Sequence, residues 1–227
     1  MPPDDAADAV HGADPRHLVV GWPGAVEPFG LAELAGAVRR FGATALRVAV
    51  PAPGDPVGLA GPASFNAEAL DAGEALVLVP GTPDGTGTIG LVPGLDARTV
   101  LWRASDAAPP VVIDPGEAGR TLRQTLVTTT ADLVRLDVAT WQPEIPDLLM
   151  NLRHREPLDL PPGTSPETVD VLERAVLCRD IVDLALADEG GAVSAHEMAA
   201  RRGCLAELDR AARRAISACC SANLVSS

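Results

Sequence analysis

Glycine and proline are crowded into the first half of this chain, and this imbalance constrains its fold more than any other feature. Up to Gly116 the sequence contains 16 glycines and 15 prolines, whereas the rest contains 5 and 6, and no proline follows Pro166. Both residue types interrupt helices and favour turns. We therefore expect short elements joined by turns in the first half and long helices in the second.

Short apolar runs alternate with short helical patterns in the first half. The third run, ALVLV, is apolar at every position, as in a parallel strand buried on both faces. An alternation of strands and helices is typical of a parallel sheet, and two further strands around a Pro-Gly turn would add an antiparallel pair. The expected strands are residues 17–21, 45–50, 75–79, 88–92 and 99–103, and the expected helices are residues 31–41 and 64–70.

The second half carries clear helix start signals. Asp114, Pro115 and Glu117 occupy the N-cap, N1 and N3 positions of a capping box. Thr164-Ser165-Pro166-Glu167 and Ser194-Ala195-His196-Glu197 repeat this chemistry. The expected helices span residues 114–138, 147–155, 164–187 and 194–219.

These patterns together predict an α/β protein. We expect a mixed, mainly parallel sheet in the N-terminal half, packed with a C-terminal helical bundle. Residues 1–16 are interpreted as a disordered acidic tail, residues 17–113 as the α/β half and residues 114–220 as the helical half. The two halves are expected to form one folding unit.

The basic residues exclude several reaction classes, because all 18 are arginine and the chain has no tyrosine. A chain without lysine forms no Schiff base and has no P-loop lysine. Arginine stays protonated and cannot replace lysine or tyrosine in proton transfer. The net charge of −13 would repel nucleic acid, and charges interrupt every apolar run before it could span a membrane. Four cysteines without a disulfide pattern favour a cytoplasmic location.

Two motifs resemble cofactor or metal sites but are incomplete. Residues 85–90, GTGTIG, match a dinucleotide fingerprint, yet no helix pattern follows them. His196-Glu197 begins HEMAA and therefore lacks the second histidine of a zinc site. We predict no cofactor and no metal.

If the first three strands are parallel, the loops that follow them share one edge of the sheet, where ligands of such sheets bind. These loops are residues 22–28, 51–62 and 80–87. The candidate acid/base groups are Asp55, Asp84 and Glu27, and the candidate ligand-binding residues are Trp22, Asp55, Asp84, Arg47 and Arg103. The alternative is that proline and glycine only stiffen surface turns here.

The last expected helix carries a group of arginines that forms a positive patch on an acidic protein. Arg210, Arg213 and Arg214 are the candidate partner-binding residues. The alternative is a solvated face that neutralises itself, because Asp209 and Arg213 are spaced i, i+4.

Three segments resemble a conserved group of uncharacterised proteins from high-GC actinobacteria: VPAPGDPVGL, WQPEIPDLLMNLR and IVDLALADEGGAVSAHEMAARRG. This resemblance implies no activity and no catalytic residues.

Two functions are compatible with these features. The first is a soluble, non-enzymatic binding or accessory protein that uses the loop-edge crevice or the last helix, with a protein partner, a second copy or a small anionic ligand. The second is a small enzyme that uses carboxylates of the loops at the carboxyl ends of the strands. Convergence of Asp55 and Asp84 in one pocket would favour the enzyme.

Overall fold

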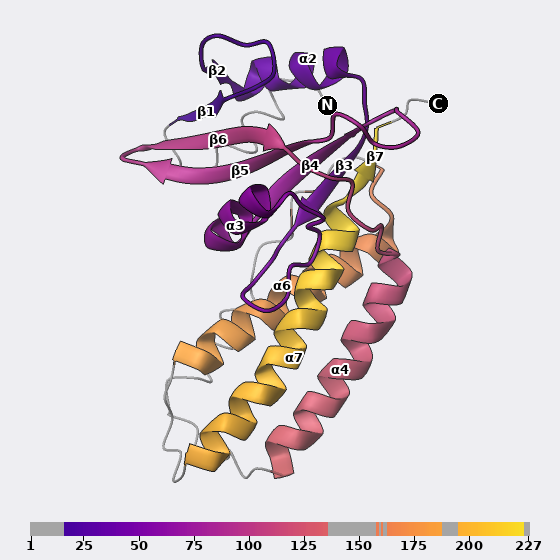
Figure 1. The fold of residues 1–227 in the computed structure, drawn as a ribbon. Coiled ribbons are helices and arrows are strands. Elements are labelled where there is room, and N and C mark those ends of the chain that lie inside the picture. The colour runs from indigo at the N-terminus through magenta and orange to yellow at the C-terminus, as the bar shows by residue number, and fades with distance from the viewer. Residues whose placement is uncertain (1–15, 136–157, 159, 161–162, 188–194, 225–227) are drawn as a thin grey trace. The chain divides into compact units, whose positions relative to one another are not determined.

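The structure is a computed structural model, and it describes residues 16–135, 158, 160, 163–187 and 195–224 (Figure 1). The chain forms two compact units. The sheet unit comprises residues 1–112 together with residues 220–227, and the helical unit comprises residues 113–219. The expected tail at residues 1–16 lies outside the described residues except for Arg16. The expected helix at residues 147–155 lies entirely outside them.

Seven strands form one sheet in the order β2-β1-β6-β5-β4-β3-β7. Five of the strand segments and both short helices expected from the sequence are present, and the α/β class with a mixed sheet is confirmed. The strands are β1 (His17–Val20), β2 (Phe29–Gly30), β3 (Ala43–Ala49), β4 (Ala75–Pro80), β5 (Ile89–Asp96), β6 (Thr99–Asp106) and β7 (Ala222–Asn223).

The expectation that the sheet is mainly parallel is wrong. Only β1 and β6 pair in parallel, and every other neighbouring pair is antiparallel. The strands at residues 17–21 and 45–50 are not neighbours, because β6, β5 and β4 lie between β1 and β3. Apolar runs reveal that a strand is buried, but they do not identify its partner or its direction.

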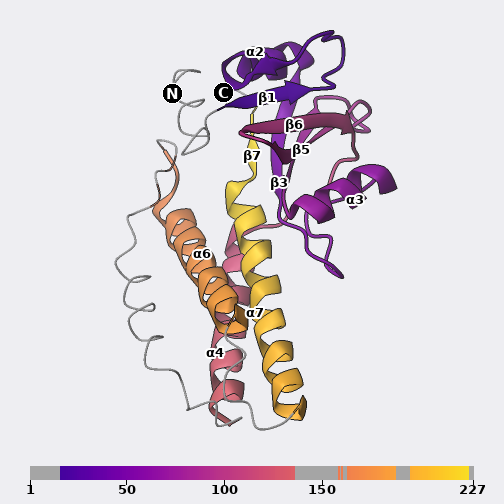
Figure 2. The same cartoon turned by 90° about the vertical axis from the view of Figure 1, so that its left-hand side faces the viewer.

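Helices on both faces of the sheet explain why β4 is apolar throughout. Helix α2 (Leu31–Phe41) and helix α3 (Ala63–Ala72) cover opposite faces (Figures 1 and 2). Leu78 of β4 belongs to the core cluster that includes Ala37 of α2, and Val77 belongs to the cluster that includes Phe65 of α3. Successive side chains of a strand point to opposite faces, so both faces of β4 are buried. An antiparallel strand covered on both sides therefore has the composition expected of a parallel one.

The glycine-rich segment at residues 85–90 is a loop that leads into β5, as the absence of a following helix pattern indicated. Gly85 and Gly87 have φ values of 68° and 89°, in the left-handed region that favours glycine. Gly90 is required for another reason: a Cβ atom there would lie 2.1 Å from Cε2 of Phe65. Turn geometry and packing thus account for these three glycines.

The short strand β7 returns to the sheet after the helical unit and pairs with β3. Arg47 of β3 holds it in place: its Nη1 donates to the carbonyl oxygen of Ala222 and its Nη2 to Oδ1 of Asn223, each over 2.8 Å. The next backbone amide, Leu224 N–H, donates to the carbonyl oxygen of Thr44 over 2.7 Å. Arg47 therefore attaches the edge strand β7 to β3.

Replacing Arg47 with alanine is expected to loosen β7 from β3. Loss of two hydrogen bonds from a guanidinium should raise the hydrogen-exchange rate of the Leu224 amide by about tenfold, that is ~1.4 kcal/mol of local stability. Arg103→Ala is the matched control, because the Arg103 side chain is exposed and forms no hydrogen bond or ion pair with any described residue. An unchanged exchange rate at Leu224 in the Arg47 variant would show that strand pairing alone holds β7.

The described part of the helical unit contains three helices: α4 (Pro115–Arg135), α6 (Pro166–Ala187) and α7 (Ala195–Cys220). Two of the three predicted caps are confirmed, since Asp114 accepts a hydrogen bond from Glu117 N–H (2.8 Å) and Ser165 from Thr168 N–H (3.1 Å). The third, at Ser194, lies outside the described residues. The three helices share one core cluster. Cys178 lies in that cluster, and burial raises the pKa of its thiol. None of the helices in the described ranges is long and apolar enough to cross a membrane.

Candidate functional site

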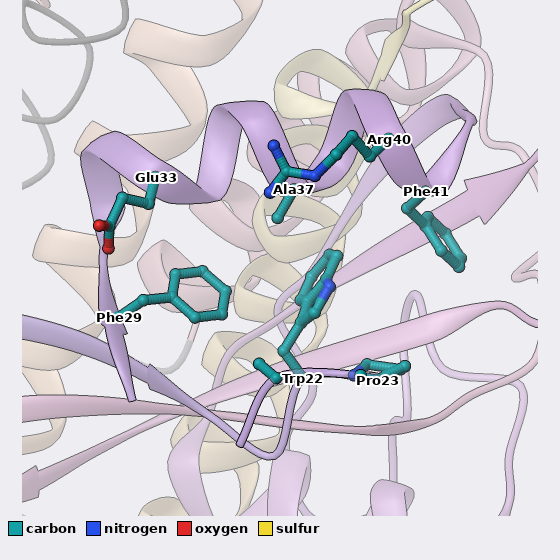
Figure 3. Close-up of a pocket in the computed structure, with 9 residues that line it drawn as sticks. Trp22, Pro23, Phe29, Glu33, Ala37, Arg40 and Phe41 are labelled. Atoms are coloured by element: carbon teal, nitrogen blue, oxygen red, sulfur yellow. The ribbon is translucent and has the colours of Figure 1, made fainter. Parts of the chain in front are cut away.

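An open pocket of about 490 Å³ lies in the sheet unit between α2 and the loop that follows β1 (Figure 3). The loop side consists of residues 22–25, and Phe29 of β2 lies beside it. The α2 side is formed by Glu33, Ala37, Arg40 and Phe41. Helical residues spaced by three or four lie on one face, so α2 presents Glu33, Ala37 and Arg40 together. We call this site the aromatic pocket.

Three of the six aromatic side chains of the protein line this pocket. Figure 3 shows the indole of Trp22 between the rings of Phe29 and Phe41. Both contacts are edge-to-face, with ring centroids 6.1 Å apart for Phe29 and 5.9 Å apart for Phe41. Such contacts stabilise beyond the burial of area alone. Trp22 is only 8% exposed, so its ring is held in one orientation.

The two charged side chains of the pocket differ in their hydrogen-bond partners. Oε2 of Glu33 accepts a hydrogen bond from Gly30 N–H over 2.9 Å, at the N-terminus of α2. The guanidinium of Arg40 forms no hydrogen bond or ion pair with any described residue. Seven residues separate Glu33 from Arg40, which places them about 10 Å apart along the helix. One oxygen of the carboxylate is therefore engaged at one end of the pocket, and the guanidinium at the other end has no partner among the described residues.

The candidate carboxylates do not converge on this pocket or on one another. The β3–β4 ladder runs from Ala43 opposite Pro80 to Ala49 opposite Ala75. The loop that carries Asp55 therefore leaves the sheet at one end of the ladder, and the loop that carries Asp84 leaves it at the other. The expectation that the three loops share one edge is wrong, because β3 runs antiparallel to β4.

Asp55 and Asp84 also differ in their surroundings. Asp55 is only 7% exposed, and its backbone forms a two-bond turn with Ala52. Asp84 is exposed, and its Oδ1 accepts a hydrogen bond from Thr86 N–H over 3.0 Å. Hydrogen bonds from the Thr86 side chain and backbone lower the pKa of Asp84. A carboxyl with a lowered pKa is a weaker general base, which is the opposite of what acid/base catalysis at neutral pH requires.

The loop after β1 and the loop after β4 do share an edge of the sheet, but they are not adjacent. Strands β6 and β5 separate β1 from β4. Three strand spacings of about 4.8 Å give a separation of about 14 Å. Glu27 in the first loop is exposed and is not among the lining residues of the aromatic pocket. Of the candidate ligand-binding residues, the structure brings only Trp22 to this pocket.

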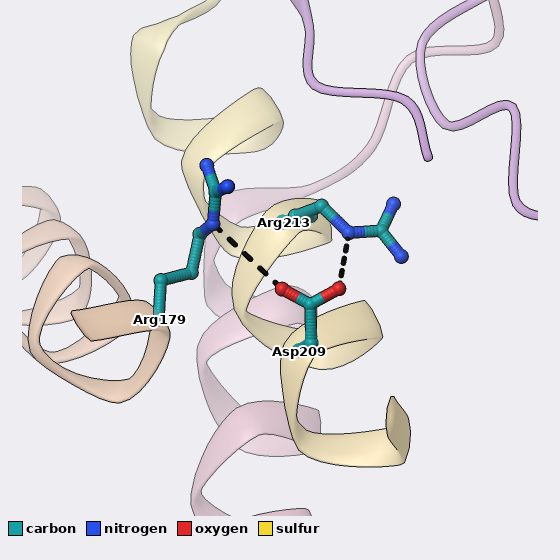
Figure 4. Close-up of polar contacts among 3 residues, drawn as sticks. All are labelled: Arg179, Asp209 and Arg213. Atoms are coloured by element: carbon teal, nitrogen blue, oxygen red, sulfur yellow. Dashed lines mark hydrogen bonds and ion pairs between the residues drawn. The ribbon is translucent and has the colours of Figure 1, made fainter. Parts of the chain in front are cut away.

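The arginines of the last helix do not form the exposed patch that the sequence indicated. Arg213 is 4% exposed, and its Nε donates to Oδ2 of Asp209 over 2.7 Å (Figure 4). Arg179 of α6 approaches Oδ1 of the same carboxylate over 3.7 Å. Arg210 is paired with Glu207 over 2.8 Å, whereas Arg214 is exposed. Arg213 is thus a buried structural residue and not part of an exposed docking surface.

Sequence reasoning missed four residues of the aromatic pocket: Phe29, Glu33, Arg40 and Phe41. The spacing of Glu33, Ala37 and Arg40 on a predicted helix was visible in the sequence. The scarcity of aromatic residues was visible too. What was not visible is that the chain turns back after Trp22, so that Phe29 pairs beside β1 and α2 lies over the indole.

Comparison with known protein families identifies both halves of the chain. The N-terminal domain of the Rv1486c-like protein matches residues 1–115, and the C-terminal domain matches residues 116–217. The chain belongs to the Rv1486c-like protein family. No curated protein and no solved structure matches it. The domain boundary of the Rv1486c-like family falls close to the structural division at Val112, but β7 lies beyond the matched C-terminal domain and completes the sheet of the N-terminal one.

Proposed function

We propose that this Rv1486c-like protein is a non-enzymatic binding protein whose small-molecule ligand occupies the aromatic pocket. The observation that carries the proposal is the concentration of aromatic side chains there: a chain with six such residues places three of them around one opening. Ligand sites are concave, largely apolar and equipped with a few polar groups, and their usual volumes are about 300–1,000 Å³. The aromatic pocket has a volume in this range and combines three aromatic side chains with two charged ones, while slightly more of its lining is polar than apolar.

The rigidity of the pocket supports the same function. Trp22 is clamped between two rings, and Gly24 allows the loop to turn back with a φ of 81°. The turn is closed by a hydrogen bond from Ala25 N–H to the carbonyl oxygen of Trp22 over 3.0 Å. A preformed site loses little conformational entropy when a ligand binds.

The cellular setting is part of this proposal. No disulfide joins the four cysteines, all of which lie in the described part of the chain. This is what a reducing compartment would produce, and we infer a cytoplasmic protein. The use of arginine as the only basic residue supports an origin in high-GC actinobacteria.

A thermal-shift screen followed by NMR tests the proposal. Compounds that bind only the native state raise the melting temperature. The indole N–H signal of Trp22 should then move on titration. The signal of Trp102 should stay, because its Nε1 already donates to Nδ1 of His17 over 3.1 Å. Trp22→Phe should weaken binding of these compounds, and Trp102→Phe should not. Stabilising compounds that move signals elsewhere and leave Trp22 unchanged would contradict the proposal.

A further inference from the structure

The hydrogen-bond donors and the acceptor of the aromatic pocket differ in whether they already have a partner. Its two side-chain donors, the Arg40 guanidinium and the Trp22 indole N–H, have no acceptor among the described residues. Its acceptor, the Glu33 carboxylate, already receives the Gly30 N–H. The indole N–H is not among the fully buried atoms without a partner, so it is accessible from the pocket. The pocket therefore offers a ligand two donors without a partner, and one oxygen of its carboxylate is already engaged.

From this imbalance we infer that the ligand is an organic anion with a flat apolar body. The inference rests on the proposed binding function and adds the chemistry of the ligand. The guanidinium of Arg40 binds a carboxylate, sulfonate or phosphate head group, and the rings of Trp22, Phe29 and Phe41 contact the body. Arginine is suited to this role because its planar fork offers two parallel N–H groups to an oxyanion.

The position of Arg40 is consistent with an external anion. It lies in the last turn of α2, next to Arg39, and about 10 Å of helix separates its backbone from that of Glu33. Figure 3 shows the Arg40 side chain extending back along α2 over the indole, toward the end of the helix that carries Glu33. The anionic group of a ligand bound there would contact the Arg40 guanidinium, and its body would contact the aromatic rings.

The other common anion site, a helix N-terminus, carries a negative charge in this pocket. Free backbone N–H groups at the start of a helix bind phosphates, but at the start of α2 the Glu33 carboxylate accepts Gly30 N–H and would repel a second anion. The pocket also lacks a lysine to hold a polyphosphate, because the chain contains none. One anionic group held by one guanidinium is therefore the arrangement that fits, and nucleotide polyphosphates do not fit it.

A pair of dyes that differ by one anionic group tests this inference. 8-Anilino-1-naphthalenesulfonate carries a naphthalene body and a sulfonate, and N-phenyl-1-naphthylamine has the same rings without the sulfonate. The dissociation constants of both are measured by fluorescence on the intact protein. Arg40→Gln should weaken binding of the sulfonate about tenfold, the loss expected for one charge-assisted hydrogen-bonded contact at a partly open site. Binding of the neutral dye should change less than about twofold.

Two control variants separate a local effect from the net charge of the protein. Arg39→Gln makes the same charge change one residue away, at a side chain that does not line the pocket. It should leave both dissociation constants unchanged. Glu33→Gln keeps an acceptor for Gly30 N–H while it removes a negative charge, so it should leave sulfonate binding unchanged or strengthen it.

The outcomes distinguish the two levels of the proposal. If both dyes move the Trp22 indole signal but Arg40→Gln leaves their affinities equal to wild type, the anionic head group is wrong and the binding function stands. If Arg40→Gln strengthens binding and Glu33→Gln weakens it, the pocket selects cations and the inference is overturned. If neither dye moves the Trp22 signal, the dyes do not bind in the aromatic pocket, and the inference of an anionic ligand there is overturned.

Discussion

Replacing Gly90 with alanine is expected to destabilise the sheet unit by about 2 kcal/mol, within the range found when a methyl group is forced into a packed core. The new Cβ would lie 2.1 Å from Cε2 of Phe65, and that ring is 1% exposed and fixed on α3. No backbone strain contributes, because Gly90 has no positive φ. The whole effect therefore comes from contact between β5 and α3.

The measurement is the free energy of unfolding in urea, followed by tryptophan fluorescence in a Trp141→Phe background. The two remaining tryptophans, Trp22 and Trp102, both belong to the sheet unit. Gly94→Ala is a matched control on the same strand, because its Cβ would meet only the Nη1 end of the Arg103 side chain, which is exposed and flexible. Phe65→Leu should recover part of the loss when it is combined with Gly90→Ala. Equal effects of the two glycine variants would contradict the packing explanation.

Replacing Asp209 with alanine is expected to cost the helical unit about 3 kcal/mol, because removal of one partner leaves a buried charge without its ion pair. Asp209 receives Arg213 at 2.7 Å and Arg179 at 3.7 Å, and the Arg213 side chain is only 5% exposed. A guanidinium at that depth has little access to water. The carboxylate therefore stabilises two arginines on two different helices.

The effect is measured by urea unfolding followed by circular dichroism and by hydrogen exchange in α6 and α7. Glu207→Ala is the control on the same helix. The Glu207–Arg210 pair is 62% and 42% exposed, and such pairs contribute less than about 1 kcal/mol. Asp209→Asn should fall between the two, because an amide oxygen still accepts a hydrogen bond. A loss in Asp209→Ala no greater than in Glu207→Ala would show that Arg213 is stabilised by its other contacts.

The helices were predictable because their signals are local. Helix α2 was expected at residues 31–41 and spans Leu31–Phe41, and it ends at Gly42 in the left-handed conformation with a φ of 75°. Asp114 and Ser165 cap α4 and α6 as the sequence indicated. A cap, a stop and a 3.6-residue period involve neighbours in the chain, so a reader of the sequence sees all the interacting groups.

Strand direction and the site were less accessible. The turn between β5 and β6 was expected at Pro93-Gly94, but both residues lie within β5 and the turn falls at Ala97, with a φ of 53°. Pro93 fits in the strand because β4 pairs with β5 only at residues 89–91, so the outer edge of β5 at Pro93 has no described strand partner. Such facts depend on pairing between distant segments, which no local pattern encodes.

The sequence by itself determined the division into a turn-rich half and a helical half, the bounds of α2, the presence of α3, and the exclusion of lysine and tyrosine chemistry. These follow from residue type and from interactions within a few residues. Only the tertiary structure decided that β3 runs against β4, which separates Asp55 from Asp84, and that Arg47 and Arg213 hold structural contacts. The same structure brings Phe29, Arg40 and Phe41 around Trp22. The physical reason is that strand order and burial are set by the summed packing of remote segments, whereas the start and the end of a helix are marked by residues within a few positions of each other.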